Sequence, residues 1–229
     1  MSTIFSSKGR KTIAAIALVA TTGLSAAACG SSDDATATTS SSSSAPAPKP
    51  VASIDSLTGN DTQIALDQGF VDALTTLKLT PGTVGSAKLA EGSLIFPITG
   101  GNVSVFKPGS VPNYVVGQIQ HEGSGLSLTA GGTKVELTNL NVDPGVSRVY
   151  GDVTVNGKTA VTSAYLFTLN GSTLKPLATG SGTATLEGTQ VQISPVAAPL
   201  LNETFKTDAV KPGLLVGIAK ITVNTTPGD

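Results

Sequence analysis

The sequence predicts a mainly β fold, an antiparallel β-sandwich or partly closed barrel, with one N-terminal helix and one short C-terminal helix packed on it. Apolar and polar residues alternate in residues 115–121, 134–138 and 149–155, as expected of strands with one buried face. Asn-Gly pairs at 156–157 and 170–171 separate strand-like runs, which is typical of tight hairpins. About nine or ten short strands at this spacing favour a sandwich or barrel.

Two helices interrupt the β pattern. The first is predicted to begin at the N-capping residues 60–62 and to end before Pro81-Gly82, with one apolar face formed by Leu66, Phe70, Leu74 and Leu77. The second is predicted to open at Ser194-Pro195 and to run through Leu200, Leu201 and Phe205.

Composition excludes several classes of protein. The 229 residues contain 14 Lys+Arg, 15 Asp+Glu, one His and one Cys. Near-neutral charge argues against a nucleic-acid binder, and the single Cys excludes a disulfide scaffold or a cysteine zinc cluster. The sequence contains no Gly-x-Ser-x-Gly elbow, no His-Glu-x-x-His and no dinucleotide fingerprint. We therefore expect a non-enzymatic protein with no catalytic residue and no metal site.

Residues 1–28 are predicted to be a lipoprotein signal peptide. Lys8, Arg10 and Lys11 precede a short apolar run at 13–20, which is far below the ~20 residues of a membrane-spanning helix. Small residues then lead to Cys29, the position at which a bacterial lipobox cysteine is acylated, for example with palmitate. The prediction is an envelope lipoprotein on the extracytoplasmic face of the cell membrane. The alternative is a plain secretory signal followed by an incidental cysteine.

The mature chain is predicted to have two parts. Residues 29–50 comprise the lipidated Cys29 and a Ser/Thr/Pro-rich tether, which lacks the apolar residues that a core requires. Residues 51–229 form the β-rich globular domain.

His121 is the only histidine and the most informative polar residue. It shares a strand face with Ile119, so the two side chains are expected to point inward together. One interpretation is a core histidine bonded to the backbone or to a tyrosine hydroxyl, and Tyr114, Tyr150 and Tyr165 are the available phenols. The other interpretation is a pocket histidine that contacts a ligand.

Residues 62–143 resemble a known family through a series of short motifs: Phe96-Pro-Ile98, Gly100-Gly101, Gly117-Gln-Ile-Gln-His-Glu-Gly123, Leu126-Ser-Leu128 and Val135-Glu-Leu137. The cadence is similar to that of the haem-transport-associated (Hta-type) domain on surface proteins of actinobacteria. The resemblance implies a non-enzymatic domain with a pocket between helix and sheet, and it matches His121 to the family's pocket histidine. Phe70 also matches, but Gly69 replaces a serine and Ala73 stands where the family carries its haem-ligating tyrosine. We therefore expect no cofactor, haem included.

Four functions are compatible with these observations. The first is binding of a small or apolar ligand, such as a lipid or a haem-like molecule, with a site formed by His121, Phe70, Leu66, Leu74, Ile119 and Tyr114. The second is an envelope interaction or spacer protein without a small-molecule pocket. A hydrolase, or haem binding through His121, depends on the lone histidine.

Overall fold

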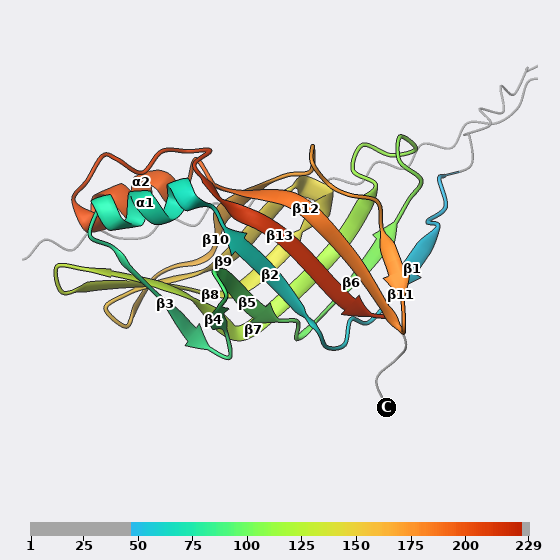
Figure 1. The fold of residues 1–229 in the computed structure, drawn as a ribbon, viewed down its shortest axis with the longest axis horizontal. Helices are drawn as coiled ribbons and strands as arrows, with labels where there is room; N and C mark the ends of the chain where they lie inside the picture. The colour runs from blue at the N-terminus through green and yellow to red at the C-terminus, as the bar shows by residue number, and fades with distance from the viewer. Residues whose placement is uncertain (1–46, 226–229) are drawn as a thin grey trace, which may run out of the picture. The chain divides into compact units, whose positions relative to one another are not determined.

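The computed structural model describes residues 47–225, which form a mainly β domain with two helices (Figure 1). All strands belong to one antiparallel sheet: β1 (Ala52–Ile54), β2 (Asp61–Leu66), β3 (Thr80–Gly85), β4 (Lys88–Ala90), β5 (Ser93–Pro97), β6 (Gly100–Val105), β7 (Val115–Ala130), β8 (Thr133–Asp143), β9 (Arg148–Val155), β10 (Lys158–Asn170), β11 (Ala178–Gly180), β12 (Thr183–Ile193) and β13 (Leu215–Asn224). The helices are α1 (Gln68–Thr76), α2 (Ala197–Phe205) and a 3₁₀ turn η1 (Pro144–Val146). The predicted mainly β, antiparallel class is confirmed.

The sheet curls into a half-barrel. Its strands hydrogen-bond in the order β1-β6-β7-β8-β9-β10-β12-β13-β2-β5-β4, while β3 pairs with the second half of β7 and β11 pairs with β12. The curl brings β5 against β7, although these two strands do not pair. The Thr99 amide, just before β6, continues the β6–β7 ladder by donating to the Gln120 carbonyl at 2.8 Å. The inward faces of β7, β8 and β9 carry the apolar residues of the predicted alternation, including Ile119, Leu137 and Val153, all buried.

One of the two predicted hairpins is confirmed. Asn156 and Gly157 adopt positive φ angles of 50° and 76° between β9 and β10, which is the conformation that a tight hairpin turn requires. The hairpin predicted at Asn170-Gly171 was wrong. There the Asn170 side chain accepts from the Ser172 amide, and the chain makes a longer excursion through β11 before β12 pairs with β10.

The start of the first helix was also predicted wrongly. Residues 61–66 form β2, because both edges of this segment are paired, with β13 on one side and β5 on the other. The helix begins after Asp67, whose carboxylate accepts from the amides of Gly69 (2.9 Å) and Phe70 (3.3 Å). It ends at Thr76, and Pro81 lies within β3 instead of terminating the helix.

The second helix begins close to the predicted residue. The Ser194 hydroxyl accepts from the amides of Val196 (3.2 Å) and Ala197 (2.9 Å) and donates to the Tyr165 carbonyl (2.6 Å). Both helices lie at the end of the sheet away from β1 and β11 (Figure 1), and both contribute to the core, α1 through Phe70 and Leu74 and α2 through Leu201. In the described part of the chain, no helix is both long and apolar enough to cross a membrane.

A row of register shifts crosses four neighbouring strands, at His121/Gly125, Thr138/Asn141 and Val161/Ala164. Asp152 of β9 bridges this row. Its carboxylate accepts from the Asn139 side chain on β8 (2.9 Å) and from the Ser163 amide on β10 (3.0 Å). Asn139 and Ser163 both have positive φ angles, so the carboxylate stabilises the irregular residues on either side of it.

Candidate ligand-binding cavity

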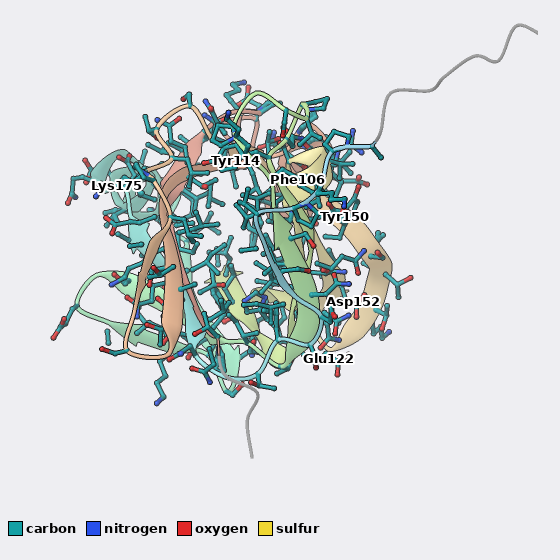
Figure 2. All side chains as sticks on the ribbon, turned by 90° about the vertical axis from the view of Figure 1, so that its right-hand side faces the viewer. Phe106, Tyr114, Glu122, Tyr150, Asp152 and Lys175 are labelled. Atoms are coloured by element: carbon teal, nitrogen blue, oxygen red, sulfur yellow. The ribbon has the colours of Figure 1, made fainter. Side chains whose placement is uncertain are left out.

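The interior of the curled sheet contains a cavity of about 610 Å³. Apolar side chains from most strands line it, among them Ile64, Phe96, Ile119, Leu140, Val149 and Ala219. Figure 2 faces the end of the molecule where β1 and β11 lie, and shows Tyr114, another lining residue, near the rim of the central space. Successive side chains of a strand point to opposite faces of the sheet, so every second side chain points inward. Because the sheet curls, the inward-pointing side chains of different strands face one another across the cavity.

His121 lies in the wall of this cavity and is 1 % exposed. Its Nδ1 is 3.2 Å from the Leu140 carbonyl oxygen, and its Nε2 is 2.8 Å from the Thr62 hydroxyl. The edge of the Phe96 ring packs against the imidazole, with the ring centroids 6.2 Å apart. Burial lowers the pKa of His121 from 6.5 to about 4, against a smaller opposing effect of the Leu140 hydrogen bond, so the imidazole is neutral at pH 7.

Among residues 47–225, no Lys, Arg, Asp or Glu lines the cavity. Figure 2 shows three labelled charged residues, Glu122, Asp152 and Lys175, on the outside of the sheet, away from the central space. The uncharged lining is consistent with the low pKa of His121, because neither a carboxylate nor a cation faces the imidazole.

The structure divides the predicted ligand-binding residues between two cavities. His121, Ile119 and Tyr114 line the large one. The helix-side residues, Leu66, Phe70 and Leu74, line a separate apolar cavity of about 40 Å³ between the helices and the sheet. Ala73 lines that small cavity too. Leu94, Leu126, Phe167 and Val216 line both cavities, so these side chains form the wall between them.

Sequence reasoning missed Thr62, the hydrogen-bond partner of His121. Thr62 is 4 % exposed, and Ile64 of the same strand is buried beside it. No polar–apolar alternation marks this strand, because residues 61–63 are polar and residues 64–66 are apolar. The prediction of a helix N-terminus at 60–62 assigned Thr62 to a cap instead.

The environment of His121 lacks the carboxylate of a catalytic triad. The partner of Nδ1 is a backbone carbonyl, and the hydroxyl at Nε2 belongs to the buried Thr62. The nearby Ser124 hydroxyl donates to the His121 backbone carbonyl at 3.0 Å and does not contact the ring. Among residues 47–225, no group of three or more His, Cys, Asp or Glu side chains is placed to hold a metal ion.

No family model and no curated protein matches the sequence. Solved structures do match. The C-terminal domain of HtaA from Corynebacterium glutamicum aligns with a TM-score of 0.52 at 17 % identity, covering 74 % of this chain and 98 % of that domain. A domain-swapped dimer of a variant of that domain aligns at 0.44, with 17 % identity and coverages of 69 % and 90 %. The haem-binding protein HtaB of the same organism aligns at 0.39, with 8 % identity and coverages of 76 % and 96 %.

These comparisons correct one expectation. The expected absence of a cofactor, haem in particular, is contradicted, because the chain has the fold of the C-terminal domain of HtaA, an Hta-type (haem-transport-associated) domain. The expectation relied on Ala73 in place of a tyrosine, whereas His121 supplies a nitrogen with a lone pair in the wall of the cavity. Residues 47–225 thus form a domain with the fold of the C-terminal domain of HtaA, and the Hta-type resemblance predicted from the sequence is confirmed.

Proposed function

We propose that the domain binds an apolar small molecule inside the curled sheet and performs no chemistry on it. The observation that carries the proposal is the cavity of about 610 Å³ with its uncharged, mainly apolar lining. Protein interiors normally pack densely, and an unfilled apolar space lowers stability. Ligand pockets have volumes of roughly 300–1,000 Å³, and this cavity falls within that range.

Haem is a second candidate, favoured by the position of one nitrogen. His121 is neutral and donates through Nδ1, so its Nε2 carries a lone pair that can ligate iron. His121 is the residue that would hold haem here, in place of the Thr62 hydroxyl that now occupies Nε2. The bound group would supply redox-active or ligand-binding iron, while the apolar lining would exclude water from the porphyrin.

A cavity-filling variant tests the proposal. Ala219 on β13 is buried and lines the cavity, whereas Ala65 on the neighbouring strand β2 is exposed. Nile red, a neutral apolar dye, should bind the purified protein in saturable fashion. We expect Ala219→Trp to weaken this binding by about tenfold or more, and Ala65→Trp to leave it unchanged. Equal binding by both variants would place the dye outside the cavity, and no binding at all would favour the spacer function.

A haemin titration separates the two candidates. A stoichiometric Soret shift that is abolished in His121→Phe would establish histidine-ligated haem. A shift that survives in that variant would exclude His121 as the iron ligand.

We also infer that Cys29 anchors the domain to the extracytoplasmic face of the cell membrane. Cys29 and the signal peptide lie outside the described residues, so the support is the sequence: basic residues, a short apolar run, small residues and then the only cysteine. A diacylglycerol attachment provides two acyl chains, which anchor stably where one does not.

A further inference from the structure

Two polar side chains lie deep in the large cavity. Of the polar residues within 47–225 that line it, only Thr62 (4 % exposed) and His121 (1 % exposed) are buried. The others are half-buried or exposed; they include Ser53 in β1 and Thr225 just after β13. A ligand that fills the cavity therefore meets one buried polar point, the Thr62–His121 pair.

The hydrogen bonds of the Thr62–His121 pair determine whether it can donate or accept toward the cavity. A carbonyl can only accept, so the contact with Leu140 places the ring proton on Nδ1. A neutral imidazole then has a lone pair at Nε2, and the Thr62 hydroxyl must donate its single proton to that nitrogen. The Thr62 oxygen retains acceptor capacity and has no proton left to donate. Toward the cavity, the pair is a hydrogen-bond acceptor.

The same point cannot accommodate an anion. No Lys or Arg of the described domain lines the cavity, and His121 is neutral, so a carboxylate or phosphate at this depth would lack both a cation and a donor. Burying an unpaired charge is far more costly than burying an unpaired polar group. A hydroxyl group, in contrast, carries the proton that the Thr62 oxygen can accept.

We propose that the ligand is an uncharged lipid with a hydroxyl group, and that this hydroxyl donates a hydrogen bond to the Thr62 oxygen. The inference rests on the proposed function, since it names the class of molecule that the same cavity takes. An anionic head group could be tolerated only at the open end of the cavity.

A series of three probes with the same chain length tests the class: dodecan-1-ol, dodecane and dodecanoic acid, each competing with Nile red for the purified protein at pH 8. We expect the alcohol to bind about tenfold more tightly than the alkane, the size of one net hydrogen bond, and more tightly than the acid. Equal affinity for all three, or tightest binding of the acid, would overturn the class while leaving the proposed function intact. Failure of every probe to displace the dye would instead overturn the proposed function.

The variant Thr62→Val/His121→Phe removes both acceptors and keeps the site apolar. Both positions are changed because in Thr62→Val alone the ligand hydroxyl could donate directly to Nε2. We expect the preference for dodecan-1-ol over dodecane to disappear, while dodecane binds as in the wild type and confirms that the cavity is intact. Thr159→Val, on the exposed part of β10, should retain the preference. A double variant that still prefers the alcohol by tenfold would show that another group binds the hydroxyl.

Discussion

His121 Nε2 and the Thr62 hydroxyl, 59 residues apart in the chain, form a 2.8 Å hydrogen bond across the interior of the curled sheet. His121 belongs to β7 and Thr62 to β2, and five strands separate β7 from β2 in the order of the sheet. The bond therefore connects two walls that do not pair through their backbones. Because both residues are buried, removal of one leaves the other without its partner in a mainly apolar interior.

His121→Ala should lower the free energy of unfolding by about 1–3 kcal/mol, because the substitution leaves the Thr62 hydroxyl and the Leu140 carbonyl without this partner in an apolar interior. Chemical denaturation at pH 7 measures the effect. Glu122→Ala, at the next residue of the same strand but on its exposed face, is the control and should change stability by less than about 0.5 kcal/mol. Equal effects of the two substitutions would contradict the buried position of His121.

Stability should also depend on the charge of His121. The imidazole of His121 has an ordinary pKa of 6.5, and in the folded protein the pKa is about 4. Between these two pH values the unfolded chain therefore binds the proton more readily than the folded chain does. The histidine thus leaves stability unaffected above about pH 6.5 and destabilises the fold progressively as the pH falls toward 4, by at most about 3 kcal/mol. Denaturation of the wild type and of His121→Phe at several pH values separates this effect. If the variant kept the wild-type slope between pH 6.5 and 4.5, another group would be responsible.

Asp152→Ala should destabilise the row of register shifts. The carboxylate accepts from the Asn139 side chain and the Ser163 amide, and these hydrogen bonds hold the pKa of Asp152 below its ordinary value. We expect a loss of about 1 kcal/mol near neutral pH. Because the pKa is lowered, the contribution is present above pH 4 and disappears only in stronger acid, below the range in which His121 titrates. An undiminished free energy of unfolding in the variant at pH 7 would exclude this role.

The two helix caps offer a matched comparison. Ser194 is 0 % exposed and accepts from the amides of Val196 and Ala197 where α2 begins, whereas Asp67 is the N-cap of α1 at a half-buried position. Replacement of either residue by Ala should cost about 1 kcal/mol through the lost cap. Ser194→Ala should cost more than Asp67→Ala, because the Ser194 hydroxyl also donates to the Tyr165 carbonyl. Thermal unfolding of the two variants ranks them, and a larger loss for Asp67→Ala would contradict the ordering.

The sequence was most informative where one face of a strand is buried. The alternation around Ile119 and His121 predicted their inward orientation correctly, because a period of two leaves no other arrangement once Ile119 is inside. The Asn156-Gly157 turn was predictable for a local reason, its need for positive φ angles. The same local signal failed at Asn170-Gly171, because β10 pairs with β12, and β11 and its flanking loops lie between them in the sequence.

The site itself was only partly predictable. Helical spacing grouped Leu66, Phe70 and Leu74 with His121, but the first three residues line the small cavity at the helix end. Which strand faces His121 depends on the closure of the whole sheet, and no local pattern specifies that Thr62 lies opposite. The size of the cavity likewise results from how far the sheet curls.

Cys29→Ala should release the protein from the membrane. The predicted anchor is covalent lipid on this single cysteine, and in the described domain no helix can span the bilayer. Partition of whole cells into detergent and aqueous phases measures the change: we expect the wild type in the detergent phase and the variant in the aqueous phase. Ser31→Ala, two residues further along, is the control and should partition as the wild type does. A Cys29→Ala protein that remained in the detergent phase would show that the domain, or another part of the chain, binds the membrane without the lipid.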